Sequence, residues 1–202
     1  MRRTLSFSIL TLALALLPGS GLLAQQGSPR DTASVTMGGK SISIEYGRPS
    51  LGDRTVDQLL SNLPEQRVWR AGSEQVTTLT TEMPLMVGGS MVPPGKYSVY
   101  VHLPQEGDYS LILNEVVGQP LKDIYDAAPA NLANEPWPHM DYSKISGQEI
   151  ARAKMDRESS NSKVDRFTIA LEPSSGGAGL EMAWGQERWS TTLKAVPSEG
   201  SR

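Results

Sequence analysis

The chain has 202 residues and no cysteine, and its 19 basic and 22 acidic residues give a formal net charge of −3. This mild acidity argues against nucleic acid or an anionic membrane surface as the main partner. The absence of cysteine excludes disulfides, thiol catalysis and cysteine-ligated zinc, so packing must stabilise the fold.

The first 24 residues are typical of a secretory leader. Arg2 and Arg3 precede an apolar run over residues 5–17, and Ala24 is a small residue at the expected cleavage point. The apolar run is shorter than the roughly 20 residues that span a bilayer. We therefore predict export to the periplasm or the medium, with no membrane span in the mature chain. The 17 basic and 22 acidic residues after the leader give a charge of −5.

The first elements expected after the leader are a hairpin and a short helix. Residues 25–34 are polar and predict a flexible lead-in. A hairpin is expected over residues 35–46, because Gly38-Gly39 suits a tight turn and the residues after it alternate in polarity. Thr55 and Gln58 have the spacing of a capping box, which predicts a short helix.

A series of short strands should follow. The polarity of residues 96–103 alternates, which places Tyr100 and His102 on one strand face and Tyr97, Val99 and Val101 on the other. The expected strands are residues 68–70, 76–81, 85–87, 90–92, 96–103 and 109–114.

Residues 118–148 contain four prolines and form the irregular part of the chain. A structureless segment of this length is uncommon in a compact domain and is usually functional or disordered. Its two tyrosines and one tryptophan favour partial docking on the rest of the domain.

The remaining chain predicts further strands. Residues 150–157 fit a helix or a strand, and we predict a strand from the alternation of Ala151, Ala153 and Met155. A strand over 164–171 and a final hairpin of 179–184 with 188–195 should complete the fold. We expect an all-β fold, an antiparallel β-sandwich or barrel-like sandwich with one short helix and a long irregular insertion. It forms a single domain over 35–196, followed by a flexible tail at 197–202.

Several motifs of the chain occur in the order found in one family of exported bacterial proteins. They are Tyr46-Gly47-Arg48-Pro49, Val68-Trp69-Arg70-Ala71-Gly72, Pro94-Gly95-Lys96-Tyr97-Ser98, Arg166-Phe167-Thr168-Ile169 and Ala183-Trp184. Over about residues 35–195 the chain resembles the DUF2911 domain, whose function is uncharacterised. The resemblance implies a fold and an exported location and no reaction. Asp53-Arg54 departs from the Gly-Arg that the family usually has.

The arginines of this region are the leading candidates for a binding site. An arginine near apolar strands needs a carboxylate, carbonyl groups or an anionic ligand for its five donors. In one interpretation, Arg48, Arg54 and Arg70 converge on a carboxylate, phosphate or sulfate beside Trp69 or Tyr46. In the other, each arginine fixes a loop by bonding to carbonyl oxygens or to an internal Asp or Glu.

Other catalytic and metal signals are weak. The only histidines are His102 and His139, whereas a zinc catalyst usually has three protein ligands, so we predict no metal or cofactor. No Gly-x-Ser-x-Gly elbow is present, and no spacing selects a pair of carboxylates. Aromatic residues could form a sugar platform, but Tyr97 and Trp184 are expected in the core and Tyr100 at the surface.

These patterns favour a non-catalytic module that binds a small polar or anionic ligand or a glycan, with residues 118–148 as a lid or rim. One alternative is a hydrolase acting on an envelope or extracellular polymer, which needs a titratable group with a shifted pKa in the same cleft. Another is a structural or interaction protein of the envelope, with an exposed apolar patch or an unpaired edge strand. The sequence leaves the oligomeric state open. The tentative ligand-binding residues are Arg48, Arg54, Trp69, Arg70, Tyr100 and His102.

Overall fold

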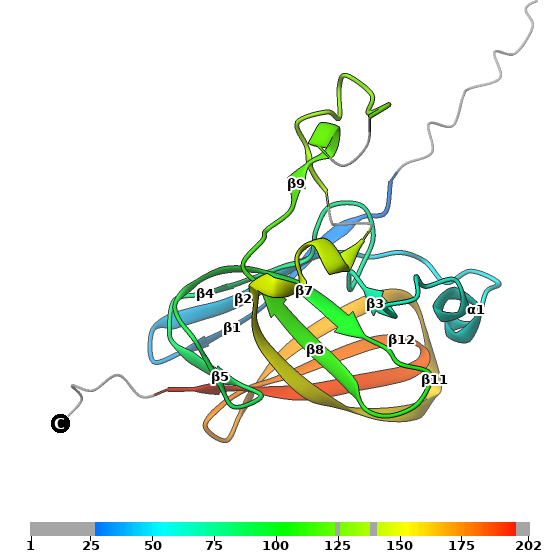
Figure 1. The fold of residues 1–202 in the computed structure, drawn as a ribbon. Helices are drawn as coiled ribbons and strands as arrows, with labels where there is room; N and C mark the ends of the chain where they lie inside the picture. The colour runs from blue at the N-terminus through cyan, green and yellow to red at the C-terminus, as the bar shows by residue number, and fades with distance from the viewer. Residues whose placement is uncertain (1–26, 124–125, 138–140, 197–202) are drawn as a thin grey trace, which may run out of the picture.

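A computed structural model describes residues 27–123, 126–137 and 141–196. It confirms the all-β prediction, because almost all of its elements are antiparallel strands that curve into a sandwich (Figure 1). The predicted leader and tail lie outside the described residues. Among the residues described, no helix combines the length and apolar character needed to cross a membrane.

The main sheet contains ten strands, and its hydrogen-bonded order is β1-β2-β4-β7-β8-β11-β12-β5-β6, with β3 paired to β7. The strands are β1 (Arg30–Met37), β2 (Lys40–Gly47), β3 (Val68–Trp69), β4 (Thr78–Thr81), β5 (Leu85–Val87), β6 (Ser90–Val92), β7 (Gly95–His102), β8 (Tyr109–Asn114), β11 (Glu149–Ser174) and β12 (Gly177–Ala195).

Local sequence signals located most of the early elements. Both predicted glycine hairpins are present, although β1 begins at Arg30, inside the predicted lead-in. The helix α1 (Val56–Ser61) begins at Thr55, whose side chain accepts a hydrogen bond from the Gln58 backbone, while the Gln58 side chain accepts one from the Thr55 backbone. The capping box is therefore confirmed.

The end of the chain differs from the prediction. Residues 150–157 are a strand, as expected, but they form one continuous strand with residues 164–171 in β11. The predicted final hairpin is wrong, because residues 179–195 belong to the single strand β12, whose hairpin partner is β11. Gly185, at φ 58°, lies opposite Val164 where the register of the two strands shifts. It marks a bulge in the ladder and not a turn.

The bulges bend the long β11–β12 hairpin enough to help close the sandwich. The Ala195 N–H donates to the Gly176 carbonyl at 2.8 Å. The last residue of β12 is therefore hydrogen-bonded to the turn that joins β11 to β12. Residues of the β2–α1 connection complete the closure, since Leu51 N–H donates to Asp165 O and Phe167 N–H to Pro49 O.

Two hydrophobic clusters hold the molecule together. The main core contains the inward face of β7, with Tyr97, Val99 and Val101, and the inward residues of β11, Ala151 and Ala153. A second cluster lies on the outward face of the same sheet and consists of Tyr100, Ile112, Tyr142 and Ile145. The predicted division of β7 into two faces is confirmed.

The irregular segment divides into an arm and a docked part. The arm contains β9 (Gln119–Pro120), η1 (Leu121–Asp123) and β10 (Pro136–Trp137), and it rises away from the sandwich in Figure 1. The docked part contains the 3-10 helices η2 (Tyr142–Lys144) and η3 (Ser146–Gln148). Because Tyr142 and Ile145 belong to the second cluster, η2 and the residue after it cover part of the outward face of the sheet.

Candidate functional site

Arg48 is held by neighbouring parts of the sandwich. Its Nε donates to the Phe167 carbonyl at 3.2 Å, one Nη to Thr168 Oγ1 at 3.1 Å, and the other Nη to Asp31 Oδ2 at 3.0 Å. These bonds join the end of β2 to β1 and β11. Arg48 thus has the contacts expected of a structural arginine, which bonds to a carbonyl oxygen and to an internal carboxylate.

Arg54 has a similar local role. Its guanidinium donates to the carbonyl oxygens of Leu51 at 3.1 Å and Ser50 at 2.8 Å, which fixes the connection before α1. It also lines a hollow of about 280 Å³ between this connection and the bulge in β12. Lys163, Asp57 and Glu187 share that hollow, so it carries both signs of charge.

Trp69 points into the main core. Its ring stacks on Trp184 with centroids 5.6 Å apart and planes 8° apart, and it contacts Phe167 and Trp189 edge-on. Trp184 and Tyr97 are buried, as predicted. The rings of Trp69 and Trp184 therefore serve core packing and do not form an external sugar platform.

The outward face of β7 carries Tyr100 and His102, two of the predicted site residues. The prediction that Tyr100 is a surface residue is wrong, because it is only 1% exposed. The Tyr142 ring covers it, with the two centroids 4.9 Å apart. His102 remains partly exposed and lies opposite Val68 on β3 and Ser110 on β8.

A polar network links the docked part of the insertion to this face. The Tyr142 hydroxyl donates to Glu149 Oε1 at 2.9 Å and accepts from Asn114 Nδ2 at 3.3 Å. Arg152 donates to both oxygens of Glu149, at 3.1 and 2.6 Å. Sequence reasoning missed these residues, because their partners are distant in the chain and no local motif marks them.

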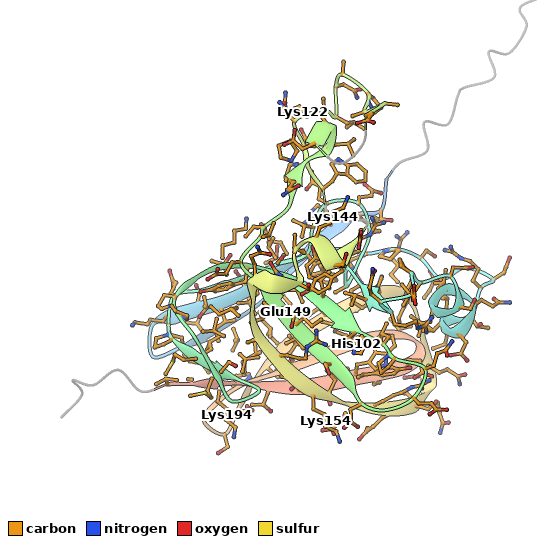
Figure 2. All side chains as sticks on the ribbon, in the orientation of Figure 1. His102, Lys122, Lys144, Glu149, Lys154 and Lys194 are labelled. Carbon is orange, nitrogen blue, oxygen red and sulfur yellow. The ribbon has the colours of Figure 1, made fainter. Side chains whose placement is uncertain are left out.

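Burial changes the proton affinity of two groups on this face. It raises the pKa of the Tyr142 hydroxyl, and the hydrogen bond that this hydroxyl donates to Glu149 raises it further. Burial lowers the pKa of His102. The nearby positive charges of Arg152 and Arg67 lower it further, whereas the negative charge of Glu149 raises it. The imidazole of His102 is therefore predominantly neutral at pH 7. Figure 2 shows His102 and Glu149 over the same side of β7 and β8.

Arg70 differs from Arg48 and Arg54. It follows β3, is partly buried, and interacts electrostatically with Glu74 and Tyr100. Burial lowers the pKa of its guanidinium. The interactions with Glu74 and, to a smaller extent, Tyr100 raise the pKa but do not offset this effect. Within the described parts of the chain, no acceptor is hydrogen-bonded to Arg70 and no carboxylate forms an ion pair with it. Arg70 is thus the candidate arginine whose donors the described residues leave available.

The loop after Arg70 has an unusual backbone. Ala71 and Glu74 have φ angles of 51° and 60°, which non-glycine residues adopt at an energetic cost. The Glu74 carboxylate accepts a hydrogen bond from the Ser28 N–H and is turned toward the chain before β1. The Ser73 hydroxyl is buried and, over the described residues, has no hydrogen-bond partner.

The base of the arm lies against the same loop. A Cβ placed on Gly118 would be 3.3 Å from the Trp137 carbonyl oxygen and 3.3 Å from Val76 Cγ1. The Trp137 indole N–H is buried, and no described residue accepts a hydrogen bond from it. Loop 70–76 and the base of the arm therefore contain several polar groups that the described fold leaves unpaired.

No described group of three or more His, Asp or Glu residues is placed to hold a metal ion. His139, the second histidine considered in the sequence, lies outside the described residues. The candidate site consists of Arg70 and its surroundings on the outward face of β3 and β7.

The fold and this site together define an all-β sandwich with an arginine-bearing outer face next to an inserted arm. The chain belongs to the DUF2911 family, described as a protein of unknown function, whose model matches residues 28–193. The resemblance drawn from the sequence motifs is confirmed. Neither the curated proteins nor the solved structures include a match.

Proposed function

We propose that the protein is an exported, non-catalytic module that binds a small polar ligand at Arg70. The state of Arg70 carries this proposal. Arg70 is partly buried and no described residue accepts a hydrogen bond from its guanidinium, so a ligand that accepts hydrogen bonds could take the place of water there. Arg48 and Arg54 take the architectural role, since each bonds to groups of the fold.

The proposal predicts a stabilising ligand whose effect depends on Arg70. A panel of phosphate, sulfate, acetate, citrate, glucose and N-acetylglucosamine would be tested by thermal unfolding and titration calorimetry. A ligand at 100 times its Kd stabilises by about 2.7 kcal/mol, which raises the Tm of a domain of this size by roughly 5–10 °C. We expect at least one compound to stabilise the wild-type protein in this way and to have no effect on Arg70→Gln.

Arg166→Gln is the matched control, because Arg166 is an exposed arginine on β11 with no hydrogen bond to another described side chain. It should respond to the ligand as the wild type does. A panel without any stabilising compound, or a compound that stabilises Arg70→Gln equally, would contradict the proposal.

The second candidate function is a hydrolase acting on an envelope or extracellular polymer. His102 favours it, because a neutral imidazole near the carboxylate of Glu149 can act as a general base, and Ser110 is its neighbour across the strand pair. Assays with p-nitrophenyl acetate and dye-labelled polysaccharides would separate the two functions. A hydrolase requires turnover that His102→Ala abolishes, whereas a binding module gives none above background.

A structural or interaction role has less support. Among the described residues, Met91 is the only large hydrophobic side chain that is exposed. The described surface therefore lacks the broad apolar patch that a permanent partner would cover.

A further inference from the structure

A second feature lies away from Arg70, namely the hollow of about 280 Å³ between the β2–α1 connection and the bulge of β12, here called the bulge hollow. We infer that the bulge hollow binds a short zwitterion, a molecule of amino-acid or dipeptide size with an ammonium group at one end and a carboxylate at the other. Arg70 does not line this hollow, so the second site is independent of the proposed function.

The floor of the bulge hollow is apolar and closely packed. It contains the buried side chains of Leu51 and Val56 and the backbone of Gly185. A Cβ on Gly185 would lie 3.1 Å from Leu51 Cδ2 and 3.1 Å from Val56 Cγ2, so the bulge packs directly on these side chains. Bulges are over-represented next to functional sites, because they redirect the side chains of a strand. The volume of the hollow is just below the roughly 300–1,000 Å³ of typical ligand pockets, which suits a small molecule.

Two positive charges lie at one end of the hollow. The Arg54 guanidinium donates to the Ser50 carbonyl, and its Nη1 has no acceptor among the described residues. Lys163 forms no ion pair with a described carboxylate, but it interacts electrostatically with Asp165, which accepts a hydrogen bond from Ser50 Oγ at 2.6 Å. Arg54 and Lys163 therefore lie on the same side, around Ser50. Asp165 does not line the hollow.

Two negative charges lie at the other end. Glu187 Oε2 accepts a hydrogen bond from Arg157 Nε at 2.7 Å, and Arg157 also interacts electrostatically with Asp57 of α1. Asp57 and Glu187 therefore lie around Arg157, which does not line the hollow. Among the described residues, Asp57 has no ion-pair partner and Glu187 Oε1 accepts no hydrogen bond, so both can receive a cationic donor.

The pairing of β11 with β12 sets the two ends apart. Lys163 adjoins the residue opposite Gly185, whereas Glu187 lies two residues further along β12. Two residues of a strand extend about 7 Å, which is also the length of two extended residues of a ligand. A zwitterion of that size can place its carboxylate at the positive end and its ammonium group at the negative end. A ligand with one kind of charge would instead meet a like charge at one end of the hollow.

The test uses a dipeptide and two analogues on the intact protein. Alanylalanine would be titrated into isotopically labelled protein and followed by the backbone amide signals in two-dimensional NMR spectra. N-acetyl-alanylalanine lacks the ammonium group and alanylalanine amide lacks the carboxylate, and both would be added at the same ionic strength. We expect alanylalanine to shift the signals of Asp57, Lys163 and Gly185 in a saturable manner. Each analogue should bind at least about fivefold more weakly.

Variants at the two ends assign the binding to this hollow. Lys163→Gln and Asp57→Asn each remove one charge, and each should weaken alanylalanine binding at least about threefold. The matched controls are Lys194→Gln and Glu106→Gln, which remove exposed charges outside the hollow and should bind as the wild type does. Arg70→Gln should also bind alanylalanine as the wild type does, whatever its effect on the ligand of the proposed function.

Three results would overturn the assignment of a zwitterion site. They are the absence of saturable shifts at Asp57, Lys163 and Gly185, an analogue that binds as tightly as alanylalanine, and a Lys163→Gln or Asp57→Asn variant that binds as tightly as the wild type. If alanylalanine binding is lost in Arg70→Gln and kept in both hollow variants, the dipeptide is a ligand of the Arg70 site. The proposed function would then be supported and the zwitterion site in the bulge hollow would be wrong.

Discussion

Arg48 illustrates how one side chain can connect three parts of this sandwich. Arg48 directly follows β2, and its guanidinium bonds to Asp31 in β1 and to Phe167 and Thr168 in β11. The side chain is only 28% exposed, so water does not fully replace these bonds when they are lost.

We predict that Arg48→Gln lowers the free energy of unfolding by about 1–3 kcal/mol, because the Phe167 carbonyl and Thr168 lose a charged donor. Asp31→Asn removes only the ion pair with Arg48, and because the Asp31 side chain is half-exposed the change should cost less than about 1 kcal/mol. Urea unfolding of both variants, with Arg166→Gln as the control, measures the difference. An Arg48→Gln variant as stable as the control would show that these bonds do not contribute.

The difference between Arg48 and Arg70 could not be predicted from the sequence. Both arginines have an aromatic neighbour and a nearby glycine. The partners of Arg48 come from residues 31, 167 and 168, which only the closed sheet brings together. No local pattern indicates that Arg70 has no such partner among the described residues. The sequence therefore marks both arginines alike, and only the described fold separates Arg48, which is hydrogen-bonded, from Arg70.

At the level of the elements, the turn of the β5–β6 hairpin packs against the start of β11. Gly88 has a φ of 58°, and a Cβ on it would lie 1.9 Å from the Arg152 carbonyl oxygen and 2.8 Å from Ala153 Cα. Gly38 occupies the same place in the β1–β2 hairpin with a φ of 57°, but a Cβ there would meet nothing within 4 Å.

The two glycines make a matched pair. Gly38→Ala should cost about 1 kcal/mol, which is the strain of a left-handed backbone. Gly88→Ala should cost at least about 2 kcal/mol more, because the backbone of β11 must move as well. Equal losses of unfolding free energy in the two variants would mean that the β5–β6 turn does not pack on β11 in solution.

Elements defined by short local signals were predicted well, and the long bent hairpin was not. The capping box, the glycine turns and the alternation in β7 each depend on residues within one or two turns of chain. The bend of β12 depends on a bulge at Gly185 opposite Val164, and Gly185-Gln186-Glu187 reads locally like a turn. Only the pairing of β12 with β11 shows that this segment is a bulge and not a turn.

On the scale of the whole molecule, the insertion between β8 and β11 does not interrupt the sheet. The strands on either side of it pair directly, with Leu111 opposite Ala153 and Leu113 opposite Ala151. The β5 strand also pairs with β12, and the residues before α1 bond to β11. The parts of the chain before and after the insertion therefore share one sheet and one core.

This arrangement predicts where a protease cuts first and what happens afterwards. Lys122 and Lys144 are both exposed residues in 3-10 helices (Figure 2), but Lys122 belongs to the arm and Lys144 to the docked helix η2. The arm is held by the two-residue β9–β10 pair and a few hydrogen bonds that continue it, including Lys122 N–H to Ala133 O, and such a pair is marginal on its own. The helix η2 is instead anchored in the second cluster by Tyr142 and Ile145. Lys-C under native conditions should therefore cleave after Lys122 well before Lys144.

The nicked protein should remain one folded particle, since every strand pair of the main sheet is unaffected by that cut. Mass spectrometry would identify the cleavage site, and size-exclusion chromatography would show whether the two fragments elute together. Lys122→Gln should delay the first cut, and Lys144→Gln should not. Equal cleavage at both lysines would mean that η2 opens as readily as the arm. Separation of the fragments would mean that the pairing of β8 with β11 cannot hold the sandwich together without the covalent connection. The insertion would then contribute to the stability of the sandwich.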